Sequence, residues 1–479
     1  MKQSSLKRNF IFNLLYQVFS IITPIITTPY ISRVLSADGI GKYSYALSIV
    51  TYFGLFGTLG ITTYGQLEIA KRRDNQIELH HIISEIVIAR LITMSISMVL
   101  YGVVIWFSKE HKLMHIILIL YLLGQMNDIS FVFQGLENFK ILAIRNIIIK
   151  IISISIIFLC IQHHDDIYLY VFVIQGTTFI GNFCLWPQVW KYIKPINWKN
   201  LCIIKHWKNS IVYFIPTIAT TVYTVLDKSM IGWITQSEFQ NGYYEQAHKI
   251  EQLLLVIVTA IGTVTLPRMA YLFEIKDEDA IHHIMELTIK IIFFLSIPMT
   301  FGLSAIADIL IPCFLGEGYD TCVSLIRVFS PLIIIVGLDN VIGKQCLIST
   351  GRQKQFNFGV IGGAILNFFM NIYLIPKFQS LGAAISSVCA ELLILIIFII
   401  ISREYLHIDN IWHIILEYIM VSMIMAIIVW IIGHSLGISP CTLIIQVITG
   451  IIIYTMGLLI IQDKFLFAII LKIKSKNYQ

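Results

Sequence analysis

The chain has 479 residues, of which 57% are hydrophobic and only 13% are charged, and its mean hydropathy is +0.81. This composition excludes an ordinary water-soluble protein and predicts an all-α polytopic membrane protein. The formal net charge of +6 is too small to indicate nucleic-acid binding, and the basic residues lie in short blocks between apolar runs, where they would set membrane topology.

The first apolar run carries a row of small and polar side chains. Six of them recur at steps of three or four, which places them on one helix face: Asn9, Asn13, Gln17, Ser20, Pro24 and Thr27. Such a face must lie against protein or water because hydrocarbon cannot satisfy polar groups. The second run follows after a short turn that contains Arg and Gly.

Further runs of roughly 20 apolar residues, the length that spans a bilayer, continue to the end of the chain. Fourteen spans are predicted, near residues 10–31, 43–62, 82–106, 113–134, 141–161, 168–190, 210–234, 250–270, 286–312, 324–348, 356–376, 382–402, 412–433 and 441–462. An even number of spans places both termini on one side of the membrane.

The basic residues are distributed asymmetrically between the predicted loops. Counted together with the adjoining span ends, loops on the side of the N-terminus carry 24 of the 34 Lys and Arg residues, and the opposite loops carry 7. The remaining three lie deeper within spans. The positive-inside rule therefore predicts that both termini are cytoplasmic. The basic stretch from Lys191 to Lys208 is interpreted as a cytoplasmic connector that divides the chain into halves.

The two halves contain similar short segments in the same order. The matching pairs are TTPY at 27–30 with TTVY at 220–223, YSYA at 43–46 with YEQA at 244–247, LGITT at 59–63 with IGTVT at 261–265, and QG at 134–135 with TG at 350–351. Because each repeat has six spans, both insert with the same orientation, which predicts two six-helix lobes with a substrate cavity between them. The predicted divisions are an N-terminal lobe at 1–195, a C-terminal lobe at 196–405, and two extra helices with a basic cytoplasmic tail at 406–479.

Enzyme motifs are missing from the sequence. There is no phosphate-binding Walker loop and no HExxH zinc motif, and the His pairs and Cys residues lack metal-ligand spacing. No extracytoplasmic loop is predicted to exceed roughly 15 residues, which leaves little room for the external catalytic loop of a membrane glycosyltransferase or polymerase. We therefore predict a transporter rather than an enzyme, with no catalytic residues, cofactor or bound metal.

Four cations lie in or beside spans, where insertion of a charge costs about 2.5 to 3.5 kcal/mol. Lys150 shares a face with Asn146 and Ser153, and Arg90 and Lys228 also lie on polar faces, whereas Arg33 ends the first span. These four residues are predicted to line a water-filled cavity and bind a phosphorylated headgroup. The alternatives are that Arg33 and Arg90 extend to the lipid headgroups and that Lys228 pairs with a neighbouring acid.

Acidic residues also occur in or beside spans. Asp128, Asp227, Asp339 and Glu391 are candidates for coupling transport to H+ or Na+, because buried carboxylates can carry protons or coordinate sodium. A structural pairing of each acid with a buried cation is an equally good interpretation.

Another spaced set lies on the eleventh span. Gly359, Gly363, Asn367 and Asn371 recur at steps of four, which favours close helix packing.

An ordered set of segments resembles the Wzx-type flippases of O-antigen, capsule and exopolysaccharide assembly, within the multidrug/oligosaccharidyl-lipid/polysaccharide (MOP) exporter superfamily. The segments are NLLYQ, TPYISRVLSADGIGKYSYALS, YGQLEIAKRRDN, QGLENFKILAIRNIIIK, LDKSMIG, GYYEQAHKI and LPRM. The resemblance covers most of the first twelve spans and adds little for the last two.

The resemblance implies two six-helix lobes that alternate access by rocking. The implied cargo is an undecaprenyl-pyrophosphate-linked oligosaccharide, turned from the cytoplasmic to the periplasmic face of the bacterial inner membrane, with an ion gradient as the energy source. Lys150, Lys228 and Arg33 fall within family-like segments and would bind the pyrophosphate. Polysaccharide polymerase and chain-length machinery are the expected partners.

Two related functions stay open at this point. An ion-coupled multidrug exporter would share the architecture but should have an acid-dominated cavity for cationic drugs, whereas cations dominate the deep positions here. A lipid II flippase would carry a similar phosphorylated cargo, and the sequence does not separate it from an oligosaccharide flippase.

The charge distribution makes a topology prediction. A reporter fused after Lys208 should have cytoplasmic activity, and a reporter fused after Asp165 should have extracytoplasmic activity. Alkaline phosphatase and green fluorescent protein fusions measure the two locations, and the opposite pattern would overturn the predicted orientation.

Overall fold

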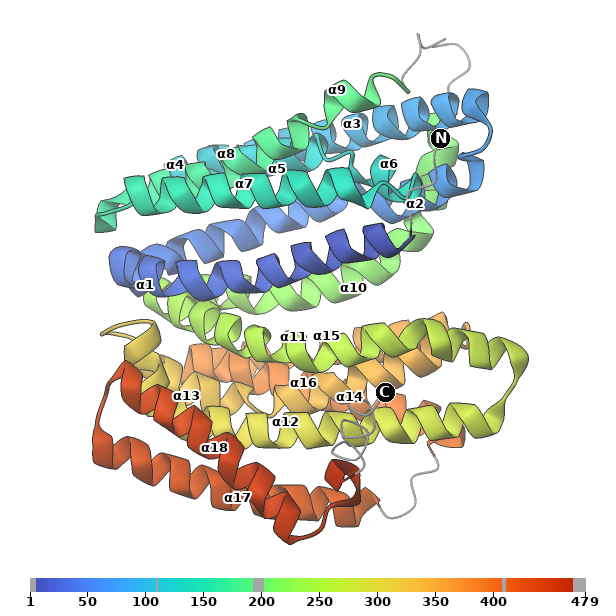
Figure 1. Ribbon diagram of the computed structural model, residues 1–479. Helices are drawn as coiled ribbons and strands as arrows, with labels where there is room; N and C mark the ends of the chain where they lie inside the picture. The colour runs from blue at the N-terminus through green and yellow to red at the C-terminus, as the bar shows by residue number, and fades with distance from the viewer. Residues whose placement is uncertain (1–5, 109–110, 193–201, 407–410, 468–479) are drawn as a thin grey trace. The chain divides into compact units, whose positions relative to one another are not determined.

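The computed structural model describes residues 6–108, 111–192, 202–406 and 411–467, and these residues form helices and no strands (Figure 1). The chain divides into two compact units, unit 1 at Met1–Gly242 and unit 2 at Tyr243–Gln479. A helical membrane protein satisfies its backbone hydrogen bonds within each segment, as hydrocarbon requires. The predicted all-α polytopic fold is confirmed.

Unit 1 is built from ten α-helices and a short 3-10 turn, and the first turn of α11 also belongs to it. The elements are α1 Leu6–Thr58, α2 Ile61–Arg72, α3 Gln76–Phe107, α4 Lys112–Ile117, α5 Ile119–Met126, α6 Ser130–Gly135, α7 Phe139–Cys160, η1 His164–Asp166, α8 Ile167–Phe183, α9 Trp186–Val189 and α10 Ile203–Thr235.

Unit 2 contains the remaining helices and one π-helical segment, η3. The elements are α11 Glu238–Ile275, α12 Glu278–Phe314, α13 Asp320–Phe329, α14 Leu332–Asp339, η3 Asn340–Ile348, α15 Gln353–Phe378, α16 Ser380–Ile401, η4 Arg403–Tyr405, α17 Ile411–Leu436 and α18 Pro440–Ile460. The two C-terminal helices α17 and α18 pack against each other and against α12.

Eleven segments of the described chain are long and apolar enough to cross a membrane. One of them, Val18–Arg72, covers most of the first predicted span and all of the second. Its α1 is interrupted between these two spans at Ser36, where φ is 55° and ψ is 175°. The long helices α10 and α11 coincide with the predicted spans at 210–234 and 250–270 but are not among the eleven. The count of fourteen spans therefore stays a prediction.

The predicted boundary between the lobes, at residues 195 and 196, lies outside the described residues, so the division into 1–195, 196–405 and 406–479 stays a prediction. In the structure, α10 groups with unit 1, where it packs against α1, α2 and α3.

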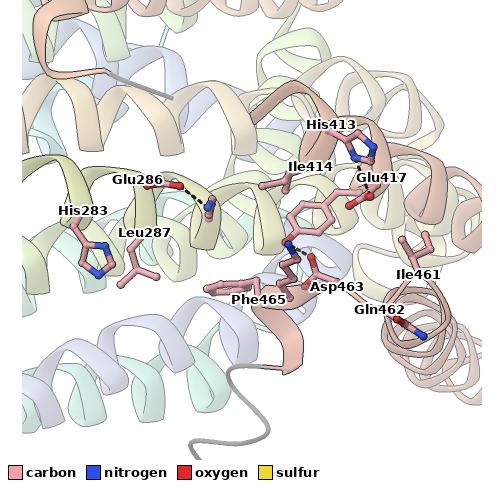
Figure 2. A pocket seen from close by; sticks show the side chains of 13 residues that line it. His283, Glu286, Leu287, His413, Ile414, Glu417, Ile461, Gln462, Asp463 and Phe465 are labelled. Atoms are coloured by element: carbon pink, nitrogen blue, oxygen red, sulfur yellow. Dashed lines mark hydrogen bonds and ion pairs between the residues drawn. The ribbon is translucent and has the colours of Figure 1, made fainter. Parts of the chain in front are cut away.

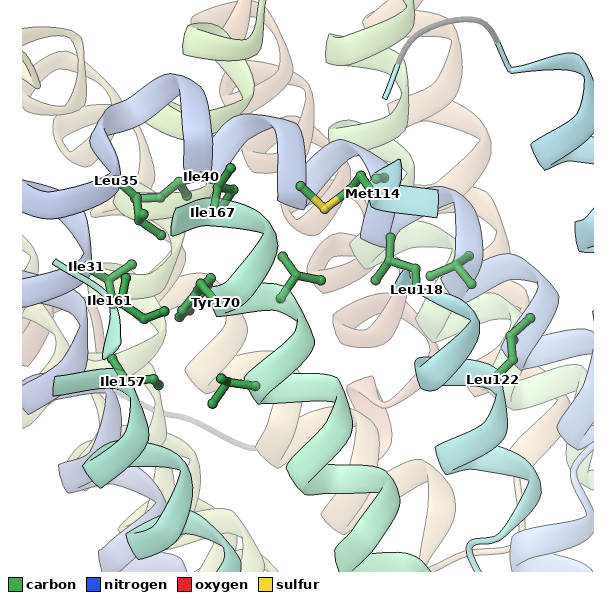
Figure 3. Close-up of a cluster of buried hydrophobic side chains, with 14 of the residues drawn as sticks. Ile31, Leu35, Ile40, Met114, Leu118, Leu122, Ile157, Ile161, Ile167 and Tyr170 are labelled. Atoms are coloured by element: carbon green, nitrogen blue, oxygen red, sulfur yellow. The ribbon is translucent and has the colours of Figure 1, made fainter. Parts of the chain in front are cut away.

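A buried apolar cluster holds four parts of unit 1 together (Figure 3). Leu35 on α1, Met114 on α4, Leu122 on α5 and Val171 on α8 are all fully buried in it. Tyr30 on α1 adds a hydrogen bond of 2.6 Å from its hydroxyl to the carbonyl oxygen of Ile161, which follows α7. Packing in this cluster fixes α1 against α7 and α8, the helices on which several candidate residues lie.

Helix α1 crosses the first turn of α11 at two glycines, which hold equivalent positions in the two sequence repeats. A Cβ atom on Gly41 would lie 1.7 Å from the carbonyl oxygen of Glu238, and a Cβ atom on Gly242 would lie 1.8 Å from the carbonyl oxygen of Ala37. The sequence repeat that pairs YSYA with YEQA also pairs Gly41 with Gly242 and Ala37 with Glu238. Equivalent positions of the two repeats therefore make the same backbone contact in both directions, which only glycine permits at this distance.

The predicted packing face of the eleventh span is confirmed. A Cβ atom on Gly359 would lie 2.6 Å from the Phe398 ring, and one on Gly363 would lie 2.5 Å from Ile394, both on α16. Asn367 and Asn371 are fully buried, and the side-chain amide of Asn371 donates to that of Asn367 at 3.1 Å. Small residues thus bring α15 close to α16, and the two buried amides share one hydrogen bond along this face.

Candidate functional site

Arg90 lies inside unit 1 and uses its guanidinium in helix packing. Its exposed fraction is 1%, and its Nε and Nη2 atoms donate to the carbonyl oxygen of Gln125 at 3.0 and 2.7 Å. Nη1 donates to the Thr62 hydroxyl at 3.2 Å, and Nη2 lies 3.9 Å from the Asp128 carboxylate. These contacts join α3 to α2 and to the end of α5. They explain the charges of Arg90 and Asp128 as a structural pair.

The polar face that Arg90 shares with Thr93 and Ser97 also contacts protein. The hydroxyl of Thr93 donates to the carbonyl oxygen of Gly57 at 2.6 Å, and that of Ser97 donates to the carbonyl oxygen of Phe53. Both acceptors belong to α1, so the face predicted from its spacing serves the α1–α3 interface. Polar side chains of this kind commonly join helices inside a membrane.

Lys150 occupies a different position, at the contact between α7 and α1. It is partly exposed, and its Nζ donates to the Ser20 hydroxyl at 2.8 Å. Ser20 belongs to the polar face predicted for the first span, whereas the side chains of Asn9, Asn13 and Gln17 lie outside the described residues. The hydroxyl solvates the ammonium group locally, and the exposed part of the lysine remains accessible to an anion.

Arg33 lies on α1 and Lys228 lies on α10, which contacts α1. Arg33 is exposed on α1, three residues before the kink at Ser36, and Lys228 is partly exposed on α10, next to the buried Asp227. α1 contacts α3, α7 and α10. All four predicted cations therefore lie on α1 or on a helix that contacts it, and Arg90 on α3 differs from the other three in being buried.

Three acidic side chains come together in unit 2. Glu391, on α16, lies close enough to Asp339, at the end of α14, and to Glu251, on α11, for their negative charges to repel one another. Asp339 is 7% exposed, Glu251 is fully buried, and neither carboxyl oxygen of Asp339 has a hydrogen-bond partner among the described residues. A proton on one of these carboxyl groups would remove part of the repulsion.

Glu251 is the member of this group that the sequence reasoning missed. It is the second residue of the predicted span at 250–270, and it was not among the acids predicted in or beside spans. The structure extends α11 from Glu238 to Ile275, so Glu251 lies more than three turns inside the helix. The signal that could have found it is the segment GYYEQAHKIEQ, which contains no Gly or Pro after its first residue and can therefore continue a helix into the predicted span. The π-helical segment η3 begins directly after Asp339, and such segments often occur at functional sites.

A cavity of about 750 Å³ in unit 2 lies between α12, α17 and the turn after α18 (Figure 2). Its charges are paired within the lining: Lys290 contacts Glu286 at 2.5 Å, and His413 contacts Glu417 at 2.9 Å. The Tyr418 hydroxyl donates to the Asp463 carboxylate at 3.3 Å. None of the predicted site residues lines this cavity.

Comparison with known sequences gives one family match and several relatives. The model of a family described as polysaccharide biosynthesis protein matches residues 6–273. A protein of Escherichia coli named as an O-antigen transporter is 22% identical over 398 residues, which cover 81% of this chain and 95% of that protein. A protein of Shigella dysenteriae with the same name is 24% identical over 397 residues, covering 82% and 98%.

Comparison with solved structures gives the same architecture. The lipid II flippase MurJ, in an inward closed conformation, matches with a TM-score of 0.76 at 15% identity, over 95% of this chain and 99% of that chain. An inward-facing multidrug-resistance MATE transporter of the MOP superfamily matches with a TM-score of 0.60 at 11% identity, over 80% and 97%. At these identities the likeness establishes the fold, which is that of the MOP transporters.

The structure separates the role of Arg90 from that of Arg33. Arg90→Ala should lower the thermal unfolding temperature of the purified protein, because breaking a buried charge pair typically costs about 3–5 kcal/mol. Arg33→Ala, at an exposed position, should leave that temperature unchanged. Thermal unfolding in detergent measures both, with Arg90→Lys as the milder variant if Arg90→Ala does not accumulate. A normal unfolding temperature together with lost transport in Arg90→Ala would place Arg90 in the cargo site instead.

Proposed function

Because the chain belongs to the family of polysaccharide biosynthesis proteins, which the match over residues 6–273 establishes, we propose that it is a Wzx-type flippase for lipid-linked oligosaccharide repeat units. The observation that carries the proposal is the group of cations on α1, α7 and α10, within a chain that has the fold of the MOP transporters. A cargo that crosses with its phosphate groups needs cations along its path, and this group supplies them.

Lys150 is the proposed principal contact of the phosphate. Its ammonium group is compact and flexible, it carries three donors, and it is held at the contact between α7 and α1 by its hydrogen bond to Ser20. The proposed cargo is an undecaprenyl-pyrophosphate-linked repeat unit, which moves from the cytoplasmic to the periplasmic face of the bacterial inner membrane while both termini stay cytoplasmic. The names of the two O-antigen transporters among the relatives support this class of cargo.

The buried acids of unit 2 are the proposed coupling group. A proton on Asp339 or Glu391 removes one negative charge from the group, and Glu251 adds to the repulsion when that proton leaves. Loading and release of this proton would bias the protein between two conformations, provided that the two states differ in proton affinity. Asp128 is a weaker candidate for this role because it lies beside Arg90.

Lipid analysis of a bacterium that lacks this gene but expresses the glycosyltransferases of its locus tests the proposal. The lipid-linked repeat unit should accumulate on the cytoplasmic face and should be cleared when the intact gene is restored. If lipid II accumulates instead, the protein is a lipid II flippase. If lipid-linked sugars are unchanged and drug sensitivity rises, it is a drug exporter.

In the same assay, Lys150→Ala should abolish export at a normal protein level, because the phosphate loses its ammonium partner, and Lys150→Arg should retain part of the activity. Lys377→Ala, in which the changed ammonium lies over the Tyr373 ring on α15 of unit 2, is the control and should export normally. Full export by Lys150→Ala would remove this residue from the site.

The coupling proposal is tested in proteoliposomes with an imposed proton gradient. Asp339→Asn and Glu391→Gln should reduce gradient-driven translocation by about 5- to 150-fold, the usual range of a coupling energy. Asp308→Asn is the matched control, because Asp308 is an exposed acid of unit 2 that pairs with Arg327 at 2.6 Å. Unchanged dependence on the gradient in both acid variants would exclude the pair as the proton carrier.

A further inference from the structure

A second cavity, of about 790 Å³, lies in unit 1, and none of the four predicted cations lines it. Residues from α1, the end of α3, the start of α4, the end of α10 and the first turn of α11 line it: Lys42, Tyr45, Ile49, Val103, Val104, Phe107, Ser108, His111, His115, Gly232, Trp233, Gln236, Ser237, Glu238 and Asn241. Its volume falls within the usual range of small-ligand sites, about 300–1,000 Å³. Its polar residues come from helix ends and turns that the charge distribution predicts to be extracytoplasmic.

The charges at this cavity compensate each other. Glu238 contacts Lys42 at 3.2 Å and His111 at 2.7 Å, and Lys42 also lies 3.6 Å from Asp38. His164 contacts Asp38 at 3.1 Å on the same side of α1. This described cluster lacks the surplus of positive charge that a phosphate headgroup requires. A ligand that is neutral and rich in hydroxyl groups fits it better.

Aromatic rings form the walls of the cavity. Trp233 is 72% exposed and Phe107 is 76% exposed. The ring of Tyr45 lies directly against Gly232 on α10, because a Cβ atom there would come within 2.2 Å of the ring. Glycine at this position thus lets the Tyr45 ring pack closely against the α10 backbone. Flat aromatic faces bind the apolar faces of sugar rings, and a fixed ring does so without loss of rotamer entropy.

Hydrogen-bonding groups lie beside these rings. Gln236 and Ser237 form the turn between α10 and α11, and Glu238 and Asn241 follow in the first turn of α11. The close contacts of Gly41 with Glu238 and of Gly242 with Ala37 hold the backbone after this turn against α1. Carboxylate, amide and hydroxyl groups on a rigid support can orient a ligand with several hydroxyl groups.

We propose that this cavity is a saccharide subsite, which binds a neutral or N-acetylated sugar of the translocated oligosaccharide on the extracytoplasmic side. Sugar rings stack on Trp233 and Tyr45, and their hydroxyl groups donate to Glu238, whose contacts with Lys42 and His111 hold it in place. The inference rests on the proposed flippase function for the origin of the sugar. It adds a contact that distinguishes between glycans, whereas Lys150 binds the phosphate common to all of them.

Saturation-transfer difference NMR on the full-length protein in nanodiscs tests the subsite. The probes are the methyl glycosides of glucose, galactose, rhamnose, N-acetylglucosamine and N-acetylgalactosamine, with glycerol phosphate and phosphoethanolamine as headgroup probes. At least one glycoside should receive saturation. Its binding should weaken roughly two- to tenfold in Trp233→Ala, which is the change expected when one aromatic contact is lost. Trp106→Ala is the matched control, because Trp106 is 80% exposed near the end of α3 but does not line the cavity.

Three results would overturn the subsite: no transfer to any glycoside, equal transfer in the wild type and in Trp233→Ala, or transfer to the headgroup probes alone. The lipid-accumulation assay separates this inference from the flippase proposal. Glycoside binding that depends on Trp233 without clearance of lipid-linked sugar would refute the flippase function and retain the saccharide site. Clearance by the wild type without glycoside binding would refute the subsite alone.

Discussion

The cost of placing polar groups in hydrocarbon determines where the charged side chains of this protein lie. Arg90 meets this cost with the carbonyl oxygen of Gln125, the hydroxyl of Thr62 and the nearby carboxylate of Asp128. Asp339 lies close to Glu391, so a proton on either of them would lower the cost. Lys150 contacts the Ser20 hydroxyl and is partly exposed. The partly exposed cation is the one that can gain most from an incoming anion, which is why we assign the phosphate to it.

The internal repeat has a visible consequence at the crossing of α1 and α11. Gly41 and Gly242 hold equivalent places in the two repeats, and each lies against a carbonyl oxygen from the residue four positions before the other. A side chain at either position would push the helices apart. The same crossing supports Glu238, whose carboxylate contacts Lys42 and His111. One close backbone contact therefore links the symmetry of the fold to the proposed saccharide subsite.

The sequence predicted those features that depend on local pattern. Apolar runs located the helices, and the spacing of Gly359 and Gly363 located the α15–α16 interface. The same reasoning could not determine which partner a polar face meets: Arg90, Thr93 and Ser97 share a face as predicted, yet that face contacts α1, α2 and the end of α5. Residues such as Lys42 and Glu238 are almost 200 positions apart in the sequence, so no local periodicity reveals that they are in contact.

The proposed cargo cations and the proposed coupling acids belong to different units of the chain. Lys150 and Lys228 lie in unit 1, whereas Glu251, Asp339 and Glu391 lie in unit 2. Under the proposals made above, each ligand favours one of two conformations of the whole protein, and the coupling energy follows from the difference in its affinity for the two. Because different residues would then bind the cargo and the proton, the cargo could change without changing the ion. A transporter built in this way can accept new glycans through substitutions around Trp233 while its coupling acids stay the same.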